Sequence, residues 1–227
     1  LVVQRASFTL DIAPEEFDAL APTILPTDNG SHRPYLQLAD ALPNGSGFCR
    51  HLLASNSMPV ADLIDSMLDD PEAWPRNALT KDDHLARCGT SCYRCLQRYN
   101  NRNYHGLLDW RLGLSYLRAM RDPTHVCGLD GNFAGHFELS DWRRLADTFA
   151  EESRTYIPGN EVKMVGPLGL PAFSIDSART KWALIVHPLW SRDGLLEHFG
   201  LGPEFVPMDT FELARRPLQV IQRAQMS

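Results

Sequence analysis

Apolar and polar residues follow one another along the chain in patterns that predict both helices and strands. The alternation from Ala6 to Ile12 predicts a strand. Residues from Pro22 to Arg33 are rich in Pro, Thr, Asn, Gly and Ser, a composition typical of a loop or of the scar of a missing segment. The apolar run from Tyr35 to Leu42 predicts a further strand, which ends at a tight turn at residues 43–47.

Helical spacing follows in the middle of the chain, and short apolar runs dominate its end. The pattern predicts helices at residues 48–54, 60–68, 107–120 and 141–154, with Ser140 as N-cap of the last. Strands are expected at residues 162–165, 172–175 and 181–187, then a short helix at 194–199 and a strand at 205–206. From Phe211 onward we expect an extended or helical end. The prediction is an α+β fold, with a mainly helical first domain at residues 1–124 and a smaller β-rich region at residues 125–227.

Composition places the chain among ordinary globular proteins. It has 227 residues, of which 44% are hydrophobic and 22% charged, and its net charge is −6. No apolar run reaches membrane-spanning length, and we expect neither a signal peptide nor a membrane anchor. A cytoplasmic location, in a reducing environment, is the corresponding prediction.

Three cysteines and a histidine form the most informative motif, Cys88-x3-Cys92-x2-Cys95-x9-His105. Thiolate sulfur and imidazole nitrogen are the usual ligands of structural zinc, which takes four of them in a tetrahedron. The spacing predicts that these four residues bind one zinc ion and staple the first domain. Such a closed shell leaves no position for a substrate, so the zinc would be structural.

The other cysteines admit different roles. The chain has five cysteines, an odd number that argues against a disulfide framework. Cys49, between Phe48 and Arg50, is best interpreted as a small core residue. Cys127 is an alternative fourth ligand in place of His105. His84 lies four residues before the cluster and is noted without an assigned role.

A basic, aromatic stretch surrounds the cysteines although the whole chain is acidic. Residues 87–121 contain seven arginines, no lysine and a single acid, Asp109, together with four tyrosines and a tryptophan. Arginine binds phosphate in a bidentate manner and stacks on bases, so the stretch predicts a nucleic-acid surface, or else a set of arginines paired with acids elsewhere. The candidate contacts on the zinc loop are Arg94, Arg98, Arg102 and Tyr99.

Other motifs for catalysis are weak or absent. The sequence contains no Gly-x4-Gly-Lys-Ser/Thr phosphate loop, so we do not expect the chain to hydrolyse ATP by that route. The turn Gly45-Ser46-Gly47 before a helix could cradle a phosphate, but a structural turn is the simpler interpretation. His187 with Asp176, Asp209 and Glu212 would be the residues of a nuclease site, although no known spacing links them.

Three segments, in order, resemble the MrfA-type zinc-binding (MZB) domain. They are Leu38-Ala-Asp-Ala-Leu-Pro-Asn-Gly-Ser-Gly-Phe48, Cys88-Gly-Thr-Ser-Cys-Tyr-Arg-Cys-Leu-Gln-Arg-Tyr-Asn100 and His105-Gly-Leu-Leu-Asp-Trp110. This domain follows the motor of many superfamily-two DNA helicases and occurs in the DrmB protein of DISARM anti-phage systems. The resemblance covers about residues 1–122. The tail, with His187-Pro-Leu-Trp190 and Asp209 to Pro217, is similar to the ends of DrmB-like proteins.

The resemblance implies a non-catalytic accessory module of a helicase or translocase in phage defence or DNA repair. It implies Cys88, Cys92, Cys95 and His105 as zinc ligands and DNA and the motor as partners. Because the motor domains are missing here, we expect a C-terminal fragment or a separate subunit, with the motor in cis or in trans. Two alternatives stay open: an interaction subunit that docks an acidic protein, and a nuclease in the tail.

Overall fold

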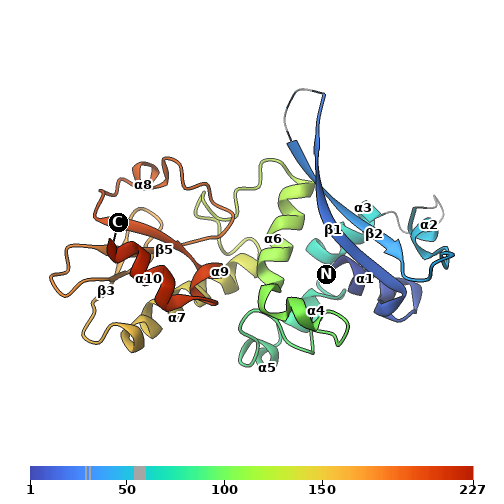
Figure 1. Cartoon of the computed structure of the whole chain (residues 1–227), viewed down its shortest axis with the longest axis horizontal. Helices are drawn as coiled ribbons and strands as arrows, with labels where there is room; N and C mark the ends of the chain where they lie inside the picture. The colour runs from blue at the N-terminus through green and yellow to red at the C-terminus, as the bar shows by residue number, and fades with distance from the viewer. Residues whose placement is uncertain (29, 31, 54–59, 227) are drawn as a thin grey trace. The chain divides into compact units, whose positions relative to one another are not determined.

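The computed structural model describes residues 1–28, 30, 32–53 and 60–226. Helices and two small sheets alternate along these ranges, which confirms the α+β class. The chain divides into two compact units, Leu1–Trp110 and Arg111–Ser227 (Figure 1). None of the described helices is long and apolar enough to cross a membrane.

The first unit combines short helices with one β-hairpin. The helices are α1 (Val2–Leu10), α2 (Phe48–Leu53), α3 (Val60–Asp69), α4 (Arg76–Leu79), α5 (Asp82–Leu85) and two 3-10 turns, η1 (Pro14–Glu16) and η2 (Arg102–Leu107). The predictions for residues 48–54 and 60–68 agree with α2 and α3, except that Ala54 lies outside the described residues. Ala6, Phe17, Leu52 and Leu63 form the centre of the core that joins these elements.

The strand predicted at Ala6 to Ile12 is wrong, because α1 occupies most of this segment. Val3, Ala6 and Leu10 recur at helical spacing and pack together in the core around Leu63 of α3. The hydroxyl of Ser7 donates a 2.9 Å hydrogen bond to the carbonyl of Gln4, three residues earlier in the helix. The alternation in the sequence was too short to distinguish a strand from a helix whose partner lies about sixty residues away in the chain.

The loop predicted at Pro22 to Arg33 is also wrong, since most of it belongs to a hairpin. Strand β1 (Phe17–Pro26) pairs antiparallel with β2 (His32–Asp40), and the register shifts between Leu20 and Thr23 (Figure 1). A two-stranded hairpin leaves one edge of each strand unpaired, where the missing N–H of a proline costs little. Prolines 22, 26 and 34 are therefore compatible with strands here.

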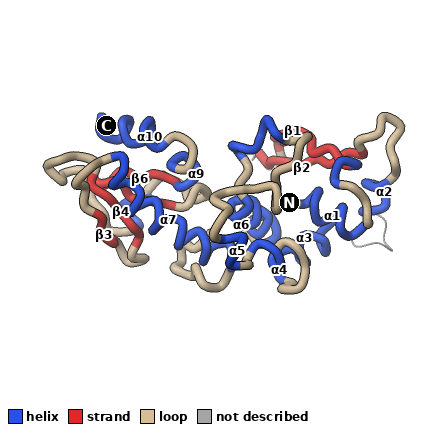
Figure 2. The backbone as a smooth tube through the Cα atoms, turned by 90° about the horizontal axis from the view of Figure 1, so that it is seen from below, coloured by secondary structure: helices blue, strands red, loops and turns tan. Residues whose placement is uncertain are grey.

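The second unit is built around a four-stranded sheet. Its strands are β3 (Val162–Val165), β4 (Leu170–Ser174), β5 (Trp182–Val186) and β6 (Phe205–Asp209), in the order β3-β4-β5-β6. Figure 2 labels β3, β4 and β6 among them. The first three are antiparallel and β6 is parallel to β5. Every residue of β4 and β5 is buried, so side chains cover both faces of these strands. The predicted strands are confirmed, and β6 is longer than expected.

Among the described residues, five helices accompany this sheet in the chain. They are α6 (Trp110–Arg121), α7 (Phe137–Tyr156), α8 (Leu195–His198), α9 (Thr210–Leu213) and α10 (Pro217–Met226), of which α8 lies between β5 and β6. Helix α7 packs on β4 and β5. It begins earlier than predicted, with His136 rather than Ser140 at the N-cap position.

The division between the units falls after Trp110, the first residue of α6, whereas the sequence placed it at 124/125, after that helix. Two ion pairs bind α6 to α7. Arg111 pairs with Asp141, and Arg118 Nε lies 2.9 Å from Glu138 Oε1, with all four side chains largely buried. Because desolvated charges need their partners, most of α6 belongs to the second unit.

Candidate metal centre

Four ligand-type side chains of the first unit converge where α5 leads into the cysteine loop. They are His84, Cys88, Cys92 and Cys95, whose ligand atoms all lie within 4.8 Å of one another. His84 and Cys88 are four residues apart on one helical turn, and Cys88 N–H donates to the His84 carbonyl at 2.8 Å. Spacing of four residues on a helix places both side chains on one face. The group is compatible with a metal site.

The Cys92–Cys95 turn brings two more sulfurs to the same point. Cys95 N–H donates to the Cys92 carbonyl at 3.0 Å, which closes the turn. The Sγ of Cys95 then lies 3.7 Å from that of Cys92 and 3.9 Å from that of Cys88. The backbone N–H of Cys92 also donates to Cys95 Sγ at 3.1 Å. A backbone donor of this kind stabilises negative charge on the sulfur.

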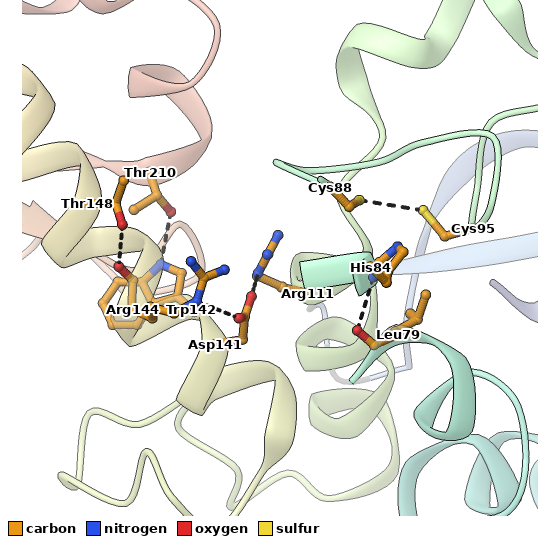
Figure 3. Close-up of polar contacts among 10 residues, drawn as sticks. All are labelled: Leu79, His84, Cys88, Cys95, Arg111, Asp141, Trp142, Arg144, Thr148 and Thr210. Atoms are coloured by element: carbon orange, nitrogen blue, oxygen red, sulfur yellow. Dashed lines mark hydrogen bonds and ion pairs between the residues drawn. The ribbon is translucent and has the colours of Figure 1, made fainter. Parts of the chain in front are cut away.

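The two ring nitrogens of His84 have different surroundings. Nδ1 lies 3.0 Å from the carbonyl oxygen of Leu79 (Figure 3), so it carries the proton and donates. Nε2 is buried and has no hydrogen-bond partner. The ring is 4% exposed and packs against Trp110, at 6.2 Å between ring centroids. A metal-binding histidine commonly holds its second nitrogen on a backbone carbonyl in this way, with the lone pair of the other directed at the ion.

Hydrogen bonding shifts the pKa values of Cys88 and Cys95 in opposite directions. The hydrogen bond from Cys88 contributes most to lowering the pKa of Cys95 to about 5, and the backbone N–H of Cys92 acts in the same direction, whereas burial acts in the opposite direction. The same contact with Cys95, together with burial, raises the pKa of Cys88. The pocket therefore favours at least one thiolate, the form in which cysteine binds metals.

His105, the fourth ligand predicted from the sequence, is not in this group. Its Nε2 lies 2.8 Å from the Arg98 carbonyl and 2.9 Å from Asn101 Oδ1, so this nitrogen donates to two oxygens. The ring also makes an edge contact with Tyr93 at 5.3 Å. His105 holds the loop after the cysteines in shape, and the structure brings His84 to the position next to the sulfurs.

The remaining cysteines lie elsewhere. Cys127, the alternative fourth ligand, is buried in the core of the second unit. Cys49 is half-buried beside the core of the first unit, close to the interpretation from the sequence. Burial, and then its hydrogen bond with Asp40, raises the pKa of Cys49 to about 11, so it is a protonated thiol.

The predicted nucleic-acid residues on the loop separate into two kinds. Arg98 is tied down, because it donates to the carbonyls of Tyr93 and Gln97 and to Gln4 Oε1. Arg94 forms an exposed ion pair with Asp83 at 2.8 Å. Arg102 lies over the ring of Tyr99, with its guanidinium carbon 5.1 Å from the centroid. Arg94, Arg102 and Tyr99 thus face solvent, whereas Arg98 has a structural role.

The Gly45–Gly47 turn is occupied by an internal anion. Asp40 accepts hydrogen bonds from the N–H groups of Gly47 at 2.7 Å and Cys49 at 2.8 Å. The bond from Cys49 contributes most to lowering the pKa of Asp40, so the carboxylate is charged. It takes the place that a phosphate would need, in agreement with the structural interpretation of this turn.

The proposed nuclease residues are engaged separately. His187 packs against Trp142 and Trp190, and its burial lowers its pKa to about 3, so the ring is neutral. The Asp176 carboxylate accepts from Thr180 and Lys181 N–H groups. Asp209 caps α9, and Glu212 pairs with Arg223 at 3.1 Å. These contacts explain each residue as part of the fold.

His84 is the ligand-type residue of this group to which the sequence analysis gave no role. Its signal was the spacing of four residues to Cys88, which corresponds to one helical turn. Recognising it required knowing that residues 82–85 are helical and that Leu79 supplies a carbonyl to Nδ1. No family model, curated protein or solved structure matches the chain, so its resemblance to the MZB domain stays a prediction that rests on the quoted motifs.

Proposed function

We propose that the chain is a non-catalytic, zinc-stabilised module that binds nucleic acid through its cysteine loop. Zinc fits the donor set of three thiolates and one imidazole. A tetrahedral ion with Zn–S bonds of about 2.3 Å places sulfur atoms about 3.8 Å apart. The observed separations of 3.7 and 3.9 Å support this assignment.

With Cys88, Cys92, Cys95 and His84 as ligands, the zinc would have a complete shell. No coordination position would be left for a substrate or an activated water, so the ion would supply folding energy and a fixed loop. The same donor set without metal would leave His84 Nε2 buried without a partner. We therefore assign the centre a structural role.

The main observation in favour of nucleic-acid binding is the exposure of three tyrosines on and beside the cysteine loop. Tyr93, Tyr99 and Tyr104 are 66%, 78% and 62% exposed. Large aromatic rings usually leave water, and rings held in solvent beside arginines are a platform on which bases stack. Arg102 over Tyr99 and Arg94 on the same loop would neutralise phosphates.

The local charge supports nucleic acid despite the net charge of −6. Arg111 and Arg118 are consumed by buried ion pairs with Asp141 and Glu138. On the loop, Arg94 and Arg102 are exposed, and Arg94 is paired with the exposed acid Asp83. The resemblance supports the further proposal that the chain is an accessory module of a superfamily-two helicase or translocase in phage defence or DNA repair.

A second candidate is an interaction subunit that docks an acidic protein. Leu107, at the end of η2, is exposed as well, and an apolar side chain next to tyrosines suits a protein interface. Base stacking needs no such residue. Binding to a motor protein in the absence of DNA binding would favour this second function.

The experiment compares two double variants by fluorescence anisotropy with labelled single-stranded and duplex DNA. Tyr99→Ala/Arg102→Ala removes one ring and one charge from the loop, and Arg154→Ala/Tyr156→Ala removes the same two residue types from α7. We expect the first pair to weaken binding about 10-fold or more, since one stacked base is worth about 1–3 kcal/mol. The salt slope should fall by about 1 for the lost phosphate contact.

The control pair should bind like the wild type. Equal affinity and salt slope for both double variants would contradict the assignment of the loop. Circular dichroism and metal content, measured on every variant, separate loss of contact from loss of fold.

A further inference from the structure

The segment between α6 and α7 encloses a polar cavity in the second unit. Its volume is about 170 Å³. Apart from Val126, Gly128 and Leu139, the side chains lining it carry ligand-type oxygen or nitrogen atoms: Asp122, Thr124, His125, Asp130, Asn132 and His136. Neither the cysteine centre nor the loop proposed to bind nucleic acid includes any of these residues.

Local hydrogen bonds hold this segment in a defined shape. Asp122 Oδ1 accepts from the N–H and hydroxyl of Thr124, at 2.8 and 2.7 Å. Asn132 Oδ1 accepts from Gly135 N–H at 3.0 Å. Cys127 and Gly128 both have positive φ, which turns the chain sharply after His125. The cavity is therefore shaped by local hydrogen bonds and by the turn at Cys127 and Gly128.

Two imidazoles meet edge to face at this cavity. The rings of His125 and His136 are 5.0 Å apart between centroids, with an interplanar angle of 77°. His125 Nε2 is buried and has no hydrogen-bond partner. An unpartnered buried nitrogen costs free energy unless something binds it.

A buried carboxylate lies close to the imidazole pair. Glu138 is completely buried, and although its Oε1 accepts from Arg118, its Oε2 has no hydrogen-bond partner. Its charge acts on both His125 and Cys127. Burial is the main cause that lowers the pKa of His125. The nearby His136 and Arg118 lower it further, whereas Glu138 and Asp122 raise it. Two ligand-type atoms without a hydrogen-bond partner, His125 Nε2 and Glu138 Oε2, therefore lie in this region.

We propose that this cavity binds a divalent transition-metal ion, with the imidazoles of His125 and His136 as ligands. Neutral imidazole is the common ligand of such ions, and carboxylates complete their shells. Two imidazoles that share an ion at about 2.1 Å, with angles near 90–110°, place their ring centroids about 4.6–5.3 Å apart. The observed 5.0 Å lies within this range.

The lining disfavours other ligands. Asp122 and Asp130 would repel an anion, and an apolar molecule would find few apolar walls. In the part of the chain that the structure describes, three ligand atoms lie within 4.8 Å of one another only in the cysteine centre. The cavity therefore offers a pair of imidazoles, and water molecules would fill the other positions around the ion. Such an open site would exchange its metal more readily than the cysteine centre.

The test measures cobalt(II) binding to the full chain, free of any histidine tag, by equilibrium dialysis and absorption spectroscopy. Cobalt on the cysteine centre gives thiolate-to-metal charge-transfer bands, and cobalt on imidazole and oxygen ligands does not. We expect two ions per wild-type chain, one of them without charge transfer. His125→Ala/His136→Ala should lose the ion without charge transfer and keep the other.

The control His51→Ala/His198→Ala removes two exposed histidines and should keep both ions. If the cysteine centre failed to bind, the wild type would still hold one ion without charge transfer, so the two assignments are separable. A wild-type chain whose only cobalt shows charge transfer would overturn the proposal. So would a His125→Ala/His136→Ala chain that retains the second ion.

Discussion

At the scale of single residues, His84 and His105 have opposite roles in the first unit. His84 presents a buried Nε2 without a hydrogen-bond partner next to three sulfurs. His105 donates the corresponding nitrogen to Arg98 and Asn101 oxygens of its own loop. The two imidazoles therefore differ in their capacity to bind a metal, although both lie near the cysteines in the sequence.

We expect His84→Ala to lower zinc affinity by more than the roughly 10–100-fold that loss of an outer-shell partner costs, because it removes a ligand. His105→Ala should keep the affinity within that range, because only loop contacts are lost. Competition with a chromophoric chelator measures both constants. If His105→Ala lost zinc and His84→Ala kept it, the ligand set predicted from the sequence would be right.

At the scale of elements, buried ion pairs decide how α6 and α7 pack. Arg111 is 1% exposed and donates to Asp141, which also accepts from Arg144 at 3.0 Å (Figure 3). A buried charge that loses its partner is strongly destabilising, whereas replacing both partners by apolar residues of similar volume is often neutral. Arg111 is thus a packing residue in a stretch whose composition resembles a nucleic-acid surface.

Arg111→Ala should lower the free energy of unfolding by about 3–5 kcal/mol, because it leaves the Asp141 carboxylate buried beside a cavity. Arg111→Met/Asp141→Leu should recover most of this loss. Arg154→Ala, which breaks an exposed pair with Glu151, should cost about 1 kcal/mol or less. Urea unfolding gives all three values. A cost for Arg111→Ala as small as that for Arg154→Ala would show that the pair is not buried in solution.

The hairpin shows how element predictions depend on context. The prolines and small polar residues of 22–33 are typical of a loop, yet β1 and β2 pair across most of the segment. Each strand of this hairpin keeps one unpaired edge, and the missing N–H of a proline costs little at such an edge. By contrast, β3 and β5 were predicted with nearly their observed bounds, because short, strongly apolar runs keep their preference in a buried sheet.

At the scale of the whole molecule, the two compact units have separate cores and separate stabilising groups. The first core is small and belongs to the same unit as the cysteine centre, and the second core includes the buried residues of the four-stranded sheet. A small core commonly needs a metal staple for stability. The units should therefore respond independently to substitutions.

Differential scanning calorimetry of two matched variants tests this independence. Cys92→Ser removes a ligand of a site worth on the order of 10 kcal/mol, so the transition of the first unit should collapse while the second stays in place. Cys127→Ser buries a hydroxyl in the second core, which should lower the free energy of unfolding of the second unit by about 1–3 kcal/mol. Only the transition temperature of the second unit should then fall. One cooperative transition that both variants shift would contradict two independent units.

The sequence by itself determined the features that depend on neighbouring residues. The spacing of Cys88, Cys92 and Cys95 brings three sulfurs together through one turn and one short helix, and short apolar runs produce the strands of the second unit. The tertiary structure decided the identity of the fourth ligand-type residue, the helical state of α1, the pairing of the hairpin and the burial of Arg111 and Arg118. Each of these depends on partners distant in the chain, whose contact free energies exceed the weak local preferences that a sequence pattern expresses.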